Sequence, residues 1–174
     1  TGERKKCPRT LIGRSLVFSP DGQKLAFASG DDVVIWTLSQ ETSEFRMKRH
    51  SVAVQSVCFD QTGSILTSGG EDRKIILWSL ESGEPIKTLV GHETGVQSLQ
   101  FSPDGRSLIG SDAESVEVWH VETGKLMGEL FPDKSCKIRI LKDAGMIVRL
   151  PLGSNVIVQS VRSFHANKTA ETGI

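Results

Sequence analysis

The chain has 174 residues, and a hydrophobic content of 37% is sufficient for the core of one ordinary globular domain. Its 21 basic and 21 acidic residues cancel, which excludes the strongly basic balance typical of proteins that bind nucleic acid or anionic membranes. No stretch has the length and apolarity of a membrane span, and no signal peptide opens the chain, so we expect no membrane partner.

The three cysteines, Cys7, Cys58 and Cys136, are widely spaced and form no CxxC pair. This pattern supports neither a zinc cluster nor a thioredoxin-like site, and it favours a reducing intracellular setting, cytoplasmic or nuclear. The chain begins with Thr1, and we expect it to be a piece of a longer protein.

A short sequence recurs along the chain. FSPDG occurs at 18–22 and again at 101–105, and the related FDQTG lies between them at 59–63. The three phenylalanines that open these copies are 41 and 42 residues apart, and the only tryptophans, Trp36, Trp78 and Trp119, follow with steps of 42 and 41. A fixed period near 41 residues indicates three copies of one structural unit.

Each copy predicts short β-strands separated by turns. Alternating apolar residues predict a first strand, the Pro and Gly of SPDG predict a turn, and further apolar runs end at the tryptophan and beyond a Gly-bearing turn. In chain order, the clearest expected strands are 33–36, 54–59, 65–68, 75–78, 85–89, 96–101, 107–109, 116–119 and 125–130. A fainter fourth unit places strands at 136–141, 146–150 and 155–159, and the polar tail 163–174 is expected to be poorly ordered.

These residues resemble the WD40-repeat family of β-propellers. The resemblance implies an all-β fold of WD40-type blades, each with four antiparallel strands, in a partial propeller of three to four blades. We expect the propeller to span 1–162, with blades at about 9–49, 50–91 and 92–131 and a degenerate blade at 132–162.

In that family a His, a Ser or Thr, an Asp and the Trp form a hydrogen-bonded tetrad that braces each blade. The second unit carries all four at the family spacing, as His50, Ser68, Asp72 and Trp78. The third unit keeps His92 and Trp119 but has Ala113 at the Asp position, with Asp112 beside it. The first unit has Arg9 and Phe27 at the His and Ser positions and keeps Asp31.

The residue types His50, Ser68 and Asp72 also match a nucleophilic triad. We favour the structural interpretation, because no strained nucleophile elbow surrounds Ser68 and a buried indole N–H needs a partner. Gly69-Gly70 lacks the Lys-Ser or Lys-Thr of a phosphate loop. The sequence therefore predicts no catalytic residue, no metal site and no cofactor.

The resemblance implies a non-catalytic scaffold that binds other proteins. In the family, contacts on the narrow top face come from residues near the tetrad His and Asp. Carried onto this chain, these positions include Arg14, Gln55, Glu71, Gln97, Asp112 and Lys137. Two alternatives stay open: the sensor region of a large ATP-dependent signalling protein, and a nucleic-acid-associated WD40 subunit that uses the basic stretches near 4–14 and 46–50. Self-association through open propeller edges is a further possibility.

Overall fold

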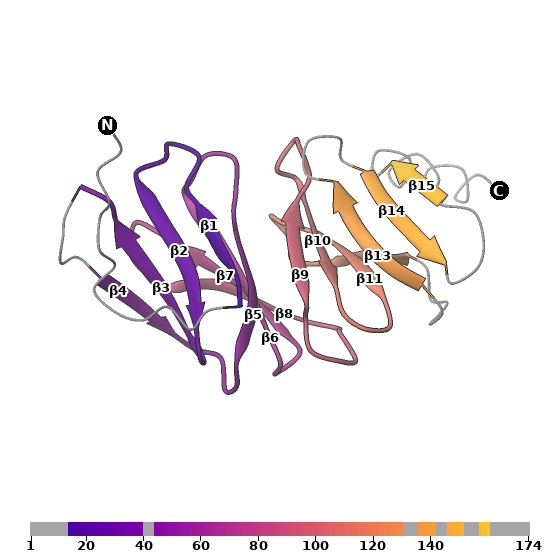
Figure 1. Cartoon of the computed structure of the whole chain (residues 1–174), viewed down its shortest axis with the longest axis horizontal. Helices are drawn as coiled ribbons and strands as arrows, with labels where there is room; N and C mark the ends of the chain where they lie inside the picture. The colour runs from indigo at the N-terminus through magenta and orange to yellow at the C-terminus, as the bar shows by residue number, and fades with distance from the viewer. Residues whose placement is uncertain (1–13, 40–43, 131–135, 142–145, 152–156, 161–174) are drawn as a thin grey trace.

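The computed structural model describes residues 14–39, 44–130, 136–141, 146–151 and 157–160, and its side chains are described for 14–39 and 45–129. The described residues form antiparallel sheets that succeed one another along the long axis of the molecule (Figure 1). They contain no helix that is long and apolar enough to cross a membrane.

Three sheets have four strands, and in each of them consecutive strands are neighbours. The first sheet, blade 1, contains β1 (Leu16–Phe18), β2 (Lys24–Ser29), β3 (Asp32–Thr37) and β4 (Glu44–Lys48). Blade 2 contains β5 (Val54–Phe59), β6 (Ile65–Gly70), β7 (Lys74–Ser79) and β8 (Pro85–Val90). Blade 3 contains β9 (Ser98–Phe101), β10 (Ser107–Ser111), β11 (Val116–His120) and β12 (Leu126–Leu130). The predicted unit of four antiparallel strands is confirmed.

The fainter fourth unit also forms a sheet. It has the order β13 (Cys136–Leu141), β14 (Met146–Pro151) and β15 (Ile157–Ser160), close to the three strands expected there. The outer limits of the predicted propeller, 1–162, and the predicted tail, 163–174, fall on residues outside the described part and stay predictions.

The repeated pentapeptide forms the hairpin between the first two strands of a blade. In blade 1 the backbone N–H of Ser19 donates to the Lys24 carbonyl, and the Asp21 carboxylate accepts from the Gln23 N–H at 3.0 Å. Gly22 has φ 68°, a left-handed conformation that a side chain disfavours. FSPDG is therefore turn chemistry, as its Pro and Gly predict.

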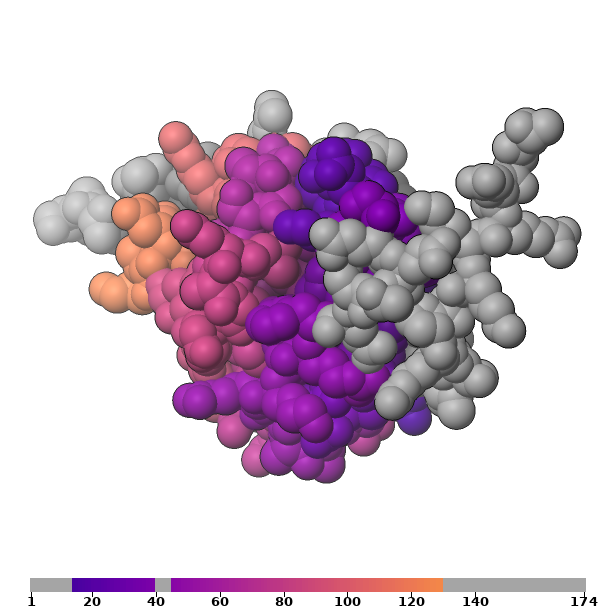
Figure 2. Space-filling model, turned by 90° about the vertical axis from the view of Figure 1, so that its left-hand side faces the viewer, coloured from indigo at the N-terminus to yellow at the C-terminus, as the bar shows by residue number. Residues whose placement is uncertain are grey.

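Blade 2 is apolar on both faces because it is packed between blades 1 and 3. In β7, Ile76 and Trp78 face blade 1, where they join a cluster with Leu66, whereas Ile75 and Leu77 face blade 3. All five of these side chains are 0–1% exposed. The surfaces of blades 1 and 2, indigo and magenta in Figure 2, are accordingly continuous.

Serine side chains link the innermost strands of successive blades. Ser15, just before β1, accepts a hydrogen bond from the Val57 N–H of β5 at 3.1 Å. One repeat later, Ser56 accepts from the Leu99 N–H of β9, also at 3.1 Å. These bonds satisfy inner-strand N–H groups that the sheet leaves free, and they fix the offset between blades.

A second inter-blade bond uses only backbone atoms. The Val54 N–H donates to the Gly30 carbonyl at 2.7 Å, and the Val96 N–H donates to the Gly70 carbonyl at 3.0 Å. Val96 was expected to lie in a strand that begins at 96, but β9 begins two residues later. Its N–H is bonded to the last residue of β6 in the preceding blade.

Truncation of Leu66 to Ala should destabilise the protein by about 2–5 kcal/mol, because it empties volume in the core between blades 1 and 2. Leu66 is fully buried, whereas Val90 is 69% exposed. The matched control Val90→Ala should therefore stay within about 0.5 kcal/mol of the wild type. Urea unfolding monitored by circular dichroism measures both, and equal midpoints for the two variants would contradict this packing.

Candidate functional site

Blade 2 contains a continuous chain of hydrogen bonds from an indole to a carboxylate. Trp78 Nε1 donates to Ser68 Oγ at 2.8 Å, and Ser68 Oγ lies 2.8 Å from His50 Nε2. His50 Nδ1 lies 2.8 Å from Asp72 Oδ1. An indole N–H can only donate, so every atom is satisfied when the Ser68 hydroxyl donates to Nε2 and the Nδ1–H donates to Asp72. The structure thus joins all four residues of the predicted tetrad.

Two glycines, Gly69 and Gly70, leave room for the tetrad because they have no side chain. A Cβ at Gly70 would lie 2.7 Å from His50 Nδ1 and 2.8 Å from Asp72 Oδ1, and a Cβ at Gly69 would lie 2.5 Å from Val96 Cγ1. Neither contact is sterically allowed. The Gly-Gly pair therefore makes room for the tetrad and for blade 3, and this requirement accounts for it without a phosphate ligand.

The tetrad is inaccessible to a substrate. Ser68 is 0% exposed, and the side chains of His50 and Asp72 are 0% and 4% exposed. Asp72 is further held by the backbone N–H groups of Ser51 and Lys74. This arrangement suits a brace between the β4–β5 connection and blade 2. Among the described residues, no group of three or more His, Cys, Asp or Glu side chains could hold a metal ion.

Asp112 requires a correction. It was predicted as an exposed contact residue, but it is only 8% exposed, and its Oδ2 lies 3.2 Å from His92 Nδ1. Counted from the equivalent paired residues Gly69↔Ile75 and Ser111↔Val116, the turn encloses five residues in blade 2 but four in blade 3, and the buried Asp of blade 3 stands before Ala113. Asp112 is thus the counterpart of Asp72 and does not belong to the contact surface.

Sequence reasoning also missed Glu117, whose Oε2 lies 3.4 Å from His92 Nε2. In blade 3, Gly110 stands at the position of Ser68 and has no hydroxyl to offer. The available signal was a charged residue in the middle of an apolar strand, at a position that Ile76 fills in blade 2.

Blade 1 has a different set of polar contacts. Asp31, expected at the tetrad position, is exposed in the β2–β3 turn, and Phe27 leaves the buried Trp36 Nε1 without a hydrogen-bond partner among the described residues. The neighbouring Asp32 is buried instead, and its Oδ2 lies 3.0 Å from Arg46 Nη1 and 3.4 Å from Lys48 Nζ. Part of the basic stretch near 46–50 therefore serves an internal ion pair. Arg9 lies outside the described residues.

Three of the predicted contact residues come together at one end of the blades. Glu71, in the β6–β7 turn, accepts from Arg14 Nη1 at 3.0 Å and from Gln55 Nε2. The Arg14 and Glu71 side chains are 64% and 45% exposed. A Cβ at Gly95 would lie 3.0 Å from Glu71 Cα, so the β8–β9 connection of blade 3 passes against this cluster.

The remaining two predicted contact residues, Gln97 and Lys137, lie later in the chain. Gln97 is exposed in the β8–β9 connection, and its backbone N–H donates to the Ser111 carbonyl at 2.8 Å. Lys137 belongs to β13, whose side chains are outside the described part. We name Arg14, Gln55, Glu71 and Gln97 the polar rim; Gln55 is half-buried, and the other three are exposed.

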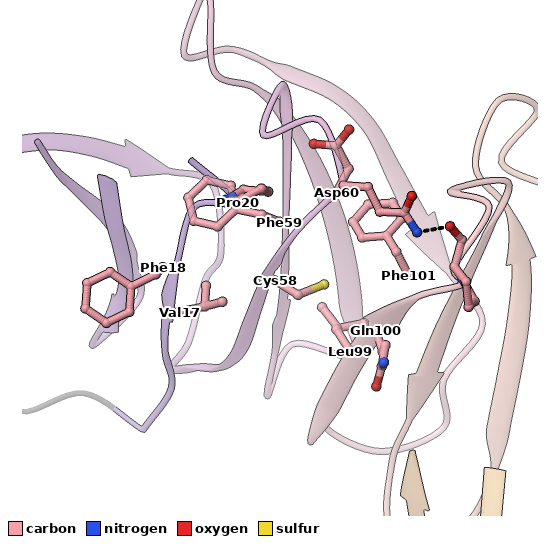
Figure 3. A pocket seen from close by; sticks show the side chains of 11 residues that line it. Val17, Phe18, Pro20, Cys58, Phe59, Asp60, Leu99, Gln100 and Phe101 are labelled. Carbon is pink, nitrogen blue, oxygen red and sulfur yellow. Dashed lines mark hydrogen bonds between the residues drawn. The ribbon is translucent and has the colours of Figure 1, made fainter. Parts of the chain in front are cut away.

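A groove of about 630 Å³ crosses the inner strands of blades 1, 2 and 3. Its wall includes Val17 of β1, Cys58 of β5 and Leu99 of β9, and the hairpin residues that follow these strands close one end (Figure 3). There the Gln61 side chain donates to the Pro103 carbonyl. The groove was not anticipated from the sequence, because its residues serve as core and turn positions within each separate unit.

Comparison with known proteins agrees with this geometry. A family described as "WD domain, G-beta repeat" matches residues 41–79 and 83–120. The chain belongs to the WD40-repeat family. Each matched WD40 repeat begins with the outer strand or turn of one blade and ends in the third strand of the next.

The curated relatives are WD40 proteins of greater length. The chain is 32% identical over 114 residues to a LEC14B homolog of Prunus armeniaca, and 31% identical over 121 residues to cilia- and flagella-associated protein 52 of Chlamydomonas reinhardtii. It is 30% identical over 119 residues to small ribosomal subunit protein RACK1 of Caenorhabditis elegans. These matches cover 62%, 65% and 67% of this chain but 24%, 20% and 36% of the relatives.

Replacement of Ser68 by Ala should lower the free energy of unfolding, because it leaves Trp78 Nε1 and His50 Nε2 buried without a partner. A buried group that loses its hydrogen bond costs about 1–3 kcal/mol, and two groups are affected. Urea unfolding followed by tryptophan fluorescence measures the change.

The control is Ser51→Ala, since Ser51 is exposed and only its backbone N–H bonds to Asp72. That variant should stay within about 0.5 kcal/mol of the wild type. If both serine variants unfold at the same urea concentration, the hydrogen-bonded chain does not stabilise the blade.

Proposed function

We propose that this WD40 protein is a non-catalytic scaffold and that a partner protein binds the polar rim. The observation that carries the proposal is the convergence of three successive blades on one exposed cluster. Arg14 precedes β1, Gln55 and Glu71 belong to blade 2, and Gly95 of the β8–β9 connection packs against Glu71. WD40 repeats are interaction modules, and the relatives support a scaffold role in general.

The chemistry of the polar rim suits a reversible interface. Glu71 accepts from both Arg14 and Gln55, but an ion pair this exposed contributes only about 0–1 kcal/mol to stability. Arg14 can therefore exchange Glu71 for a carboxylate of the partner at little cost. Because a guanidinium fork matches a carboxylate with two parallel hydrogen bonds, we expect a partner segment that presents an acidic side chain next to exposed backbone amides.

The setting that we propose is intracellular, in the cytoplasm or nucleus. The Cys58 side chain is half-buried, and its Sγ lies 2.8 Å from Thr67 Oγ1. The three cysteines are widely spaced and form no CxxC pair, which suits a reducing compartment.

Charge reversal in the variant Glu71→Arg should abolish partner recovery. It replaces the acceptor of Arg14 and Gln55 by a second guanidinium, so the rim loses the carboxylate that would accept from the partner's backbone amides. The two guanidinium groups also repel each other, which moves Arg14 away from the position where it would bind the partner's carboxylate, while the blade core is untouched. Affinity capture from a lysate with tagged wild-type and variant chains, followed by quantitative mass spectrometry, gives the ratio for each captured protein.

The matched control is Glu81→Arg, an exposed residue in the β7–β8 turn at the opposite end of blade 2. It makes the same change in net charge, so proteins captured only through bulk electrostatics should respond to both variants. The polar rim is not the interface if specific partners survive Glu71→Arg, or if Glu81→Arg removes them equally well.

A further inference from the structure

Blade 3 buries four polar side chains where blade 2 has its tetrad. His92 lies between two carboxylates, with Nδ1 at 3.2 Å from Asp112 Oδ2 and Nε2 at 3.4 Å from Glu117 Oε2. The side chains of His92, Asp112 and Glu117 are 1%, 0% and 7% exposed, and Trp119 is 4% exposed. Because this imidazole is buried between two buried carboxyl groups, the stability of the cluster depends on how many protons the three groups hold together.

Gly91 and Gly110 leave the space that the side chains of His92 and Glu117 occupy. A Cβ at Gly110 would lie 2.6 Å from His92 Nε2 and 2.9 Å from Ile75 Cδ1, so a serine like that of blade 2 does not fit there. A Cβ at Gly91 would lie 2.9 Å from Glu117 Oε2. Two glycines thus frame the carboxylate, which takes the place of the serine hydroxyl between the histidine and the indole.

The carboxylate of Asp112 accepts hydrogen bonds from several donors. It receives the backbone N–H groups of Thr94, Glu114 and Ser115 in addition to the His92 ring. Burial alone would raise the pKa of Asp112, but these donors outweigh it and hold that pKa below its usual value. Asp112 therefore stays ionised, and the Nδ1–H of His92 donates to it.

The contact between His92 Nε2 and Glu117 Oε2 then needs one proton. With a proton between them, either atom can carry it and the other accepts. Without it, an imidazole lone pair faces a carboxylate oxygen, and both are buried. His92 Nε2, Glu117 Oε2 and Trp119 Nε1 have no hydrogen bond of standard geometry to other atoms of the described chain, so nothing else there compensates for the missing proton.

The surrounding charges favour a protonated Glu117. Burial, then the charge of Asp112, then that of Glu129 on the adjacent strand β12 raise the pKa of Glu117 to about 7, with Glu93 adding to this and the Trp119 indole opposing it. Burial lowers the pKa of His92 in spite of the carboxylates around it. Blade 2 presents the apolar Ile75 to this site.

We propose that His92, Asp112, Glu117 and Trp119 form a proton-binding site, and that the joint between blades 2 and 3 is held more firmly when one proton is shared by His92 and Glu117 than after that proton leaves. The two blades differ in the group between the histidine and the indole. Blade 2 has the neutral hydroxyl of Ser68 there, whereas blade 3 has the titratable carboxyl group of Glu117.

The sign of the pH effect follows from Glu117. Because its pKa in the folded protein, about 7, lies above the ordinary value of 4.5, its contribution to stability is complete below pH 4.5 and is lost as the pH rises to about 7. His92, with a lowered pKa, acts in the opposite direction below its ordinary value of 6.5. The global melting temperature therefore mixes both effects, and a local measurement is needed.

The three tryptophans supply that measurement, one in each of blades 1, 2 and 3. In a ¹H–¹⁵N spectrum of the full chain between pH 5.5 and 8.5, the Trp119 indole signal should shift with a midpoint near pH 7, because its N–H lies beside Glu117. The Trp78 indole N–H donates to Ser68 and not to a carboxylate, so its signal is the internal control and should behave identically in the wild type and in variants of Glu117. Single Trp→Phe variants assign the signals.

The variant Glu117→Gln keeps the shape of the side chain and removes the titrating acid. It should abolish the shift of the Trp119 signal, whereas Glu122→Gln, an exposed acid in the β11–β12 turn, should leave it unchanged. The melting-temperature difference between wild type and Glu117→Gln should also become less favourable to the wild type from pH 5 to pH 7. A Trp119 signal that shows no midpoint near pH 7, or that moves equally in Glu117→Gln, overturns the proposal.

Discussion

Every described interface between the blades depends on sheets that are apolar on both faces. A strand such as β7 directs Ile76 toward blade 1 and Ile75 toward blade 3, and both residues are fully buried. No blade can bury both faces alone, so hydrophobic burial drives the sheets together, and this force has little directional preference. Direction comes from polar atoms in phase with the repeat: the side chains of Ser15 and Ser56, which accept N–H groups from the next inner strand, fix how far each sheet is offset from its neighbour.

The buried indole is the second constraint, and the three blades meet it differently. Trp78 donates to Ser68, and Trp119 lies beside the carboxylate of Glu117, whereas Trp36 has no partner within the described residues. The rings of Trp78 and Trp119 pack between successive blades, and the ring of Trp36 packs with Leu25, Phe27 and Val34 of blade 1. The indole N–H requires only an acceptor nearby, and this requirement can be met by an alcohol or an acid. The β8–β9 connection carries His92, which contacts Glu117, and also Gly95 and Gln97, so one segment of the chain joins the acid of blade 3 to the polar rim.

Most of the fold could be predicted from the sequence because the repeat period and the tryptophan phase place the strands independently of any single residue. The tetrad of blade 2 was predictable for the same reason, since its four residues keep the family spacing. Asp112 was assigned to the wrong environment because spacing counts residues along the chain, and a turn shorter by one residue moves a carboxylate from the surface to the interior. Glu117 could not be recognised as a buried acid, because alternation of Val and Glu is also what a strand with one solvated face shows. Only the contact with blade 2 decides between these environments, and that contact is absent from the local sequence.

The matched repeats are out of phase with the sheets, and this affects how the protein comes apart. The match at 41–79 contains the outer strand of blade 1 together with β5, β6 and β7 of blade 2, and the match at 83–120 repeats this arrangement for blades 2 and 3. Unravelling any one unit of sequence therefore removes a strand from one sheet and dismantles the next. Adjacent sheets are coupled by the covalent chain as well as by their packed faces. We therefore expect the unfolding of one blade to extend to its neighbours.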